Sequence, residues 1–112
     1  MNTEMQAWYA KTFGAKMLPA NPGSAFVQDQ LPGVFLNFSP SPTPTVGTTG
    51  RALDHIGFEI KDLEAFTKKL QAEGIQLTVP YTKAPQLGLS IAFIKDPWGT
   101  NIELTEGLVN IK

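Results

Sequence analysis

His55 is the only histidine in the chain, and it lies in a stretch where polar and apolar residues alternate. Residues 53–60 read LDHIGFEI, a period-two pattern that predicts a half-buried strand with His55 on its polar side. A similar stretch at residues 100–106 reads TNIELTE and places Glu103 on its polar side. If both strands pack their apolar sides under one helix, the imidazole and the carboxylate project from the same sheet face. Such a pair could hold a divalent metal ion or work as an acid–base pair.

A structural interpretation of these two residues stays open beside the chemical one. A single histidine in a strand is more often structural, and a glutamate near a strand end is more often solvated. A non-haem iron site commonly uses two histidines and one carboxylate, with open positions for substrate. The pattern supplies only two candidate protein ligands, so His55 and Glu103 alone would bind a metal weakly.

The composition fits one compact globular domain and excludes several classes of protein. The 112 residues are 42% hydrophobic and 17% charged, which are ordinary values. A net charge of -1 gives no support for binding to nucleic acid or to an anionic membrane. Without cysteine, neither a disulfide framework nor a thiolate metal site can form. There is no apolar run of membrane-spanning length and no signal-peptide pattern at the start, so we expect a soluble, cytoplasmic protein.

The elements that would position the two residues follow from hydrophobic periodicity. We expect an amphipathic helix over residues 3–14 and a second one, capped by Asp62, over residues 62–73. The apolar stripes of these helices are Met5, Trp8, Tyr9, Thr12 and Phe13 in the first, and Leu63, Phe66 and Leu70 in the second. The predicted strands cover residues 24–30, 33–39, 53–60, 75–79, 89–96 and 100–106. Residues 81–88 are interpreted as a loop, and the proline-rich residues 39–50 as a stiff spacer.

The two halves of the chain resemble each other, which indicates a weak internal duplication. Setting EMQAWYAK against DLEAFTKK aligns the helices, and setting PGVFLNF against WGTNIEL aligns the last strands, so that Asn37 meets Glu103. In this alignment the counterpart of the His55 strand would lie before Met1. We therefore expect an incomplete first module over residues 1–46, including the spacer from about residue 39, and a complete second module over residues 47–112.

These residues resemble the vicinal oxygen chelate superfamily, which contains glyoxalase I, extradiol dioxygenases, and bleomycin- and fosfomycin-resistance proteins. The resemblance is carried by ALDHIGFEIKDLEAFTKKLQAEGI and LSIAFIKDPWGTNIELTEG in residues 51–108, and more loosely by the first half. It implies an α+β fold of paired βαβββ modules that form a U-shaped sheet cleft. The first module here would lack its first strand.

The resemblance also implies roles for particular residues. His55 and Glu103 match metal ligands of the second module, and Glu103 would also be catalytic. The metal would be a divalent ion such as Fe, Mn, Ni or Zn. The ligand usually supplied by the first strand of the first module has no counterpart in this sequence. The substrate-binding positions implied in the cleft are Phe35, Asn37, Phe93 and Asn101.

Two functions remain open from the sequence. The first is a metal-dependent enzyme, such as a lyase or dioxygenase, that acts on a small oxygenated metabolite. The alternative is a metal-free protein that binds or sequesters a small molecule, as resistance proteins do, or a catalytically incomplete shortened family member. The open sheet edge of the first module predicts a homodimer, with or without exchanged modules, because unpaired edges recruit other chains. A monomer in solution would contradict this.

Overall fold

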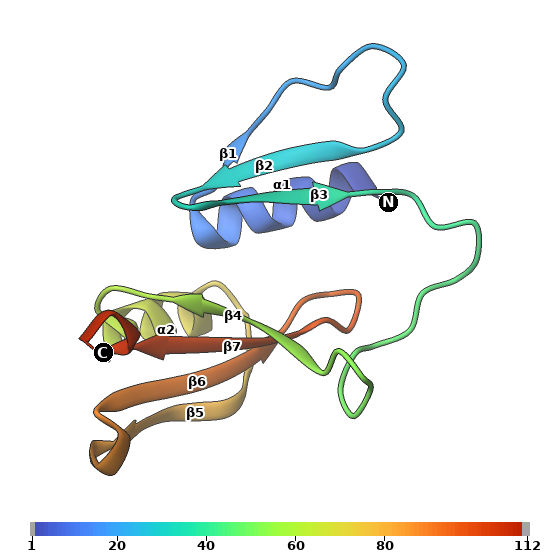
Figure 1. The fold of residues 1–112 in the computed structure, drawn as a ribbon. Helices are drawn as coiled ribbons and strands as arrows, with labels where there is room; N and C mark the ends of the chain where they lie inside the picture. Colours follow the sequence, from blue (N-terminus) through green and yellow to red (C-terminus); the bar gives the residue numbers. More distant parts are fainter. Residues whose placement is uncertain (1, 111–112) are drawn as a thin grey trace. The chain divides into compact units, whose positions relative to one another are not determined.

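The structure, a computed structural model, describes residues 2–110 and divides into two compact units (Figure 1). Unit 1 is Met1–Pro44 and unit 2 is Thr45–Lys112, and each is described by itself. Over these described residues, two α-helices, two short 3₁₀ helices and two sheets make an α+β fold, which confirms the predicted class. Among residues 2–110, the helices fall short of the length and apolar character needed to span a bilayer.

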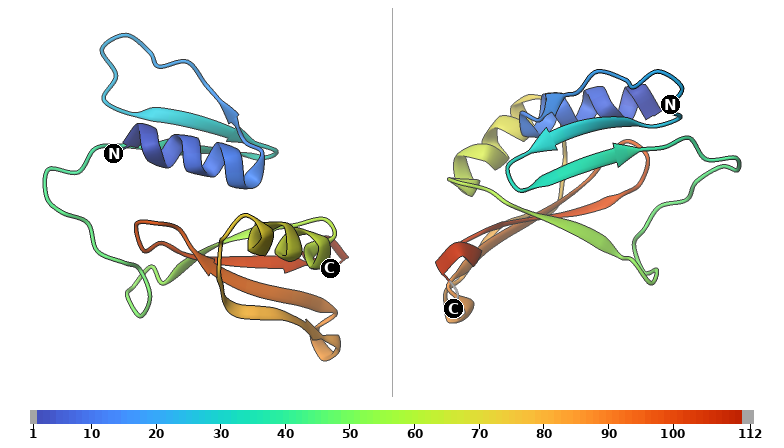
Figure 2. Two further views of the ribbon diagram at one scale, coloured as in Figure 1. Left: turned by 180° about the vertical axis from the view of Figure 1, so that it is seen from behind. Right: turned by 45° about the horizontal axis from the view of Figure 1, so that its top comes forward.

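Unit 1 consists of one helix on a three-stranded antiparallel sheet. Its elements are α1 (Asn2–Phe13), β1 (Lys16–Met17), β2 (Val27–Leu31) and β3 (Val34–Phe38), and the sheet order is β1-β2-β3. The two views of Figure 2 show α1 along one face of this sheet. Gly33 forms the turn between β2 and β3 with φ of 80°, a conformation that costs little only for glycine.

The buried face of α1 is more polar than the sequence predicts. Gln6, Tyr9 and Thr12 are its buried residues, whereas most of the expected apolar stripe is only half-buried. The reason is a hydrogen-bonding role: the Gln6 side chain donates to the backbone oxygens of Leu18 and Gln28, at 3.4 and 2.9 Å. The helix therefore ties together the ends of β1 and β2 through an amide, a contact that periodicity does not reveal.

Asp29, at the centre of β2, is a carboxylate buried beneath α1. Its exposed fraction is 0%, and neither carboxylate oxygen has a hydrogen-bond partner among residues 2–110. Burial raises the pKa of Asp29, because an apolar environment disfavours the charged form, and the nearby Gln6 amide only partly opposes this. The folded state thus favours a neutral Asp29 more strongly than the unfolded chain does.

We expect Asp29→Asn to stabilise the protein at neutral pH. A carboxyl whose pKa is raised on folding makes the native state less stable as pH rises through that pKa, since the unfolded chain ionises first. Removing the charge should raise the free energy of unfolding at pH 7 by about 1–3 kcal/mol, with a smaller gain at about pH 4. Urea unfolding at the two pH values measures this. Glu4→Gln, which neutralises an exposed carboxylate in the same unit, is the control, and equal effects of the two variants would contradict the burial argument.

Unit 2 is a complete βαβββ module, as the sequence predicts. Its elements are β4 (His55–Glu59), α2 (Leu63–Ala72), β5 (Leu77–Ala84), η1 (Pro85–Leu87), β6 (Leu89–Lys95), β7 (Asn101–Glu106) and η2 (Leu108–Asn110). The sheet order is β4-β7-β6-β5, with β4 and β7 parallel and the other pairs antiparallel. Figure 1 shows α2 on one face of this sheet.

The two faces of the unit 2 sheet differ sharply in character. One face packs under α2 and forms the core, whose fully buried side chains are Leu63, Leu70, Ala92, Ile94, Ile102 and Leu104. Parallel pairing of His55 with Asn101 and of Gly57 with Glu103 places these residues together on the opposite face. The alternation in the sequence therefore assigned the faces of β4 and β7 correctly.

The start of α2 is fixed by carboxylates. Asp62 adopts a left-handed conformation, with φ of 55°, and its side chain accepts a hydrogen bond from the backbone N–H of Ala65 at 3.4 Å. Glu106, at the end of β7, accepts hydrogen bonds from the backbone N–H groups of Asp62 and Leu63, at 3.0 and 3.1 Å. The helix is thereby attached to the strand that carries Glu103, which holds helix and strand in register.

The fifth strand is longer than the sequence predicts. β5 continues through Pro80 to Ala84, so the first four residues of the loop predicted over 81–88 extend an edge strand instead, and η1 follows at Pro85–Leu87. Pro80 lacks an N–H but is tolerated because, within the described residues, β6 is the one strand beside β5, and the pairing with β6 shifts register around Pro80.

The two units share a turn before their last strand, while the duplication proposed from the sequence stays a prediction. Gly33 and Gly99 both adopt positive φ in the turn before the last strand of their unit. Leu36 of β3 pairs with the buried Asp29, whereas Asn37 lies on the opposite sheet face, as Glu103 does in unit 2. In unit 2, β7 lies between β4 and β6, whereas among residues 2–110 β3 pairs only with β2. The first module thus has three strands, without an equivalent of β4 in the described chain.

Candidate functional site

His55 and Glu103 meet on the open face of the unit 2 sheet. Nε2 of His55 lies 3.1 Å from Oε2 of Glu103, and the two side chains are 40% and 28% exposed. His55 begins β4, and Glu103 lies two residues along β7 from the residue paired with His55. Gly57, directly opposite Glu103, has no side chain to fill the space between them. The two side chains predicted from the sequence pattern are therefore brought together.

The other ring nitrogen of His55 faces a second carboxylate. Nδ1 lies 2.9 Å from Oδ2 of Asp54, and this oxygen also accepts a hydrogen bond from Nδ2 of Asn101 at 3.1 Å. The other carboxylate oxygen of Asp54 accepts from the backbone N–H of Gly50. The imidazole thus lies between Asp54 on one side and Glu103 on the other.

This arrangement shifts the proton affinities of both partners. The backbone N–H of Gly50 holds the pKa of Asp54 below its ordinary value, with further lowering by His55 and Asn101. The hydrogen bond to Asp54 raises the pKa of His55, and the negative charge of Glu103 adds to this, although desolvation opposes it. In the absence of another cation, the two carboxylates therefore favour the imidazolium form.

Residues just before β4 hold Asp54 in place through hydrogen bonds. The hydroxyl of Thr48 donates to the backbone oxygen of Asp54 at 2.7 Å and accepts from the backbone N–H of Asn101 at 2.9 Å. The backbone N–H of Thr48 donates to the carbonyl of Gly99 at 3.1 Å. At the same point Gly47 and Gly99 come into close backbone contact. The end of the stretch interpreted as a spacer is therefore part of the site, and sequence reasoning missed both Asp54 and Thr48.

Phe93 and Asn101 also lie beside the pair. The ring of Phe93 meets the His55 imidazole edge to face, with centroids 5.6 Å apart, and Phe93 pairs with Glu103 across β6 and β7. Asn101 is only 8% exposed, and its amide is bonded to Asp54. Both lie in the group of residues around His55, and their predicted contact with substrate stays a prediction.

The remaining two predicted positions, Phe35 and Asn37, lie in unit 1. Both are on the face of the sheet opposite α1, and Phe35 is 57% exposed. The amide of Gln28 donates to Oδ1 of Asn37 at 2.7 Å. Their expected role in substrate binding likewise stays a prediction.

The donor atoms of His55 and Glu103 suit two adjacent positions around one metal ion. Ligand atoms about 2.1 Å from a cation and at a right angle to each other are about 3.0 Å apart. The observed separation of Nε2 and Oε2 is 3.1 Å. Among residues 2–110, no group of three histidine, cysteine, aspartate or glutamate side chains could hold a metal. The described residues thus fit part of a coordination shell.

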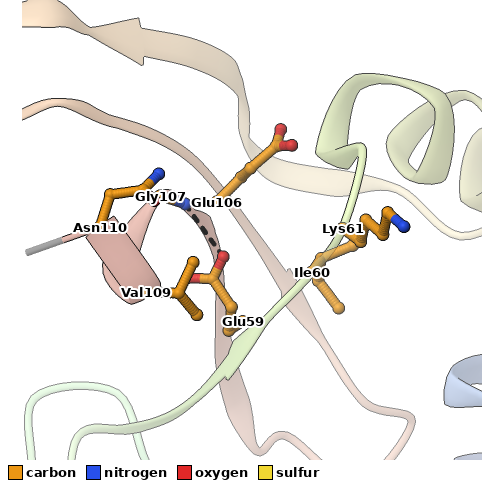
Figure 3. Close-up of a pocket in the computed structure, with 7 residues that line it drawn as sticks. All are labelled: Glu59, Ile60, Lys61, Glu106, Gly107, Val109 and Asn110. Carbon is orange, nitrogen blue, oxygen red and sulfur yellow. Dashed lines mark hydrogen bonds between the residues drawn. The ribbon is translucent and has the colours of Figure 1, made fainter.

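A pocket of about 390 Å³ lies at the opposite end of β4 (Figure 3). Glu59 uses both of its carboxylate oxygens there to accept hydrogen bonds from the backbone N–H groups of Gly107 and Leu108, at 2.9 and 2.8 Å. The carboxylate of Glu106 is likewise occupied in capping α2. The lining residues are Glu59, Ile60, Lys61, Glu106, Gly107, Val109 and Asn110. The two acidic groups of this pocket therefore serve as helix caps.

Known structures share this fold along nearly the whole chain. A putative glyoxalase family protein from Bacillus anthracis has a TM-score of 0.75 at 18% identity, covering 95% of this chain and 84% of that one. The fosfomycin resistance protein FosX from Listeria monocytogenes has a TM-score of 0.74 at 17% identity, with 96% and 85% covered. Lactoylglutathione lyase from Agrobacterium tumefaciens has a TM-score of 0.66 at 21% identity, with 95% and 85% covered.

The sequence itself matches a family model. Residues 3–104 match the model described as Glyoxalase/Bleomycin resistance protein/Dioxygenase superfamily. No curated protein matches the chain. The match spans both units, including the helix of unit 1 and the strands that carry His55 and Glu103, and it confirms the resemblance seen in the sequence. The chain therefore belongs to the glyoxalase/bleomycin resistance protein/dioxygenase superfamily.

Proposed function

We propose that this chain binds a divalent metal ion through Nε2 of His55 and the carboxylate of Glu103, and that it acts on a small oxygenated molecule. The observation that carries the proposal is the 3.1 Å separation of the two donor atoms on an open sheet face. Two neighbouring parallel strands carry the two residues, so their backbone positions are held in register. The carboxylate of Asp54 on the second ring nitrogen adds support, because metal-binding histidines commonly donate that N–H to a carboxylate.

The residues around the pair have separate roles in this proposal. When bound, a divalent cation would supply Lewis acidity to oxygen atoms of the substrate. His55 and Glu103 would hold it, with the remaining positions left to substrate, water or groups outside the described residues. Glu103, which is 28% exposed, would also be placed to accept a proton from a substrate bound beside it. Phe93 would provide an apolar wall against the imidazole.

The proposed reaction class rests on the names of proteins that share this fold and on the superfamily description. Structures with this fold include a protein named for fosfomycin resistance and one named lactoylglutathione lyase. The superfamily description also names dioxygenases. We therefore propose lyase-type or dioxygenase-type chemistry on a small oxygenated metabolite, with Fe, Mn, Ni or Zn as the candidate metals.

A second candidate function rests on the same ion pair. His55 and Glu103 satisfy each other's charge at 3.1 Å without a metal. In that case unit 2 would use the imidazole, the carboxylate and Phe93 to bind a small molecule without chemistry. The superfamily description names bleomycin resistance proteins, which makes sequestration the natural form of this alternative.

Metal titration of the purified wild-type protein separates the two functions. We expect one site per chain, saturating with at least one of Fe²⁺, Mn²⁺, Ni²⁺ and Zn²⁺ by isothermal titration calorimetry after treatment with chelator and removal of the chelator. Circular dichroism before and after chelation serves as the control that the protein stays folded. Folded protein that binds none of the four ions would refute the metal proposal and leave the sequestration alternative.

A further inference from the structure

We infer that Asp54 is a positioning residue that fixes the orientation and tautomer of His55, leaving Nε2 free to bind a metal. The inference rests on the proposed metal-binding function and assigns it a further residue. Two carboxylates flank the imidazole ring of His55. They are at similar distances, 2.9 Å for Asp54 and 3.1 Å for Glu103, but they are held very differently.

Asp54 is fixed on several sides. Its carboxylate accepts hydrogen bonds from the backbone N–H of Gly50 and from the amide of Asn101, in addition to its contact with His55. Its backbone oxygen accepts from the hydroxyl of Thr48. A carboxylate with this many donors cannot turn away without leaving them unsatisfied.

Glu103 is less restrained. Among residues 2–110, its side chain has His55 as its only hydrogen-bond or ion-pair partner, and it is 28% exposed. It can therefore turn its oxygens toward a cation without breaking a second interaction. The fixed carboxylate lies on Nδ1 and the adaptable one on Nε2, so the ring is anchored on one side and open on the other.

The tautomer follows from this asymmetry. An ionised carboxylate only accepts hydrogen bonds, so the contact between His55 and Asp54 requires a proton on Nδ1 of the ring. A neutral imidazole with a proton on Nδ1 carries its lone pair on Nε2, the nitrogen that faces Glu103. Asp54 thus selects the form of the ring in which the correct nitrogen is free to bind a metal.

The hydrogen bonds that hold Asp54 in place extend to the turn before β7. Thr48 connects the backbone oxygen of Asp54 with the backbone N–H of Asn101, the residue paired with His55. It also donates to Gly99 in the turn. The residues before β4 and the start of β7 are thereby linked, so the orientation of the imidazole depends on the segment that precedes the strand.

Nitrogen-15 NMR of His55 tests the inference, because a chain with one histidine gives one pair of imidazole signals. At a pH where the ring is neutral, we expect the metal-free wild type to show the Nδ1–H tautomer. Asp54→Ala should shift the ring toward the Nε2–H tautomer, which free histidine favours in water. It should also weaken Zn²⁺ binding about 10–100-fold, the range typical when the orienting partner of a metal ligand is removed.

A second pair of variants tests whether the change at His55 comes from a general loss of structure. Thr48→Val removes the hydroxyl that donates to the backbone oxygen of Asp54. It should change the His55 signals in the same direction as Asp54→Ala, but by a smaller amount. Thr82→Val removes a comparable hydroxyl that bonds to Pro80 on the far strand, and it should leave the signals unchanged. Wild-type signals and Zn²⁺ affinity in folded Asp54→Ala would overturn the inference. Wild-type protein that binds no metal but shows the Nδ1–H tautomer would refute the proposed function while leaving the role of Asp54 intact.

Discussion

Glu103→Gln is expected to weaken binding of a divalent metal by at least about 100-fold, more than the loss of an orienting partner does. The substitution keeps the size of the side chain but removes the charged oxygen that faces Nε2 of His55. His55→Ala should have a similar effect, since it removes the other donor. Neither change should unfold unit 2, because both side chains lie on the open sheet face and not in the core. Calorimetric titration of each variant beside the wild type measures the loss.

Glu59→Gln is the matched control for this result. It makes the same change of charge on the same sheet, but at the end of β4, where Glu59 caps η2. Its metal affinity should match the wild type even if its stability falls. Equal losses in Glu59→Gln and Glu103→Gln would mean that net charge, and not coordination, controls binding.

Acidification gives an independent check on the same site. Nε2 of His55 must lose its proton before it can bind a metal. Asp54 and Glu103 raise the pKa of His55, so proton competition begins at a higher pH than for an ordinary histidine. Metal affinity should therefore fall as the pH drops through this raised pKa.

The sequence predicted the part of the fold that depends on simple alternation. Period-two patterns located β4 and β7 and gave the correct faces, which put His55 and Glu103 on the same side of the sheet. Family resemblance then supplied the βαβββ connectivity, which the structure confirms in unit 2. The first inference rests on local periodicity, the property that a single sequence records most directly, and the second rests on resemblance to a known family.

The parts that sequence reasoning missed depend on contacts between distant residues. Thr48 and Asp54 act through Asn101, about fifty positions away, and no local pattern marks such a bond. The burial of Gln6 in α1 is explained only by the strand carbonyls that it meets. The strand predicted to end at residue 79 continues to Ala84, because Pro80 is tolerated in β5 at the edge of the described sheet.

Gly99→Ala is expected to be among the most destabilising single changes in unit 2. Gly99 has φ of 92°, and a Cβ there would lie 2.9 Å from the backbone Cα of Gly47. A side chain therefore adds left-handed strain, about 1–2 kcal/mol, to an overlap that only a backbone shift can relieve. We expect the free energy of unfolding to fall by about 3–5 kcal/mol in total.

Gly33→Ala separates the two causes, because Gly33 is the equivalent glycine of unit 1. It has φ of 80°, but nothing lies within 4 Å of its added Cβ, so it should cost only the strain of about 1–2 kcal/mol. Chemical denaturation of both variants measures the difference, and equal losses would remove the close approach of Gly47 as a cause.

If the close approach of Gly47 to Gly99 contributes to the loss, the backbone shift in Gly99→Ala also displaces Thr48, which bonds to the Gly99 carbonyl and to the backbone oxygen of Asp54. Folded Gly99→Ala should then show weaker metal binding, whereas Gly33→Ala should not, because the turn before β7 supports both the fold of unit 2 and the orientation of His55.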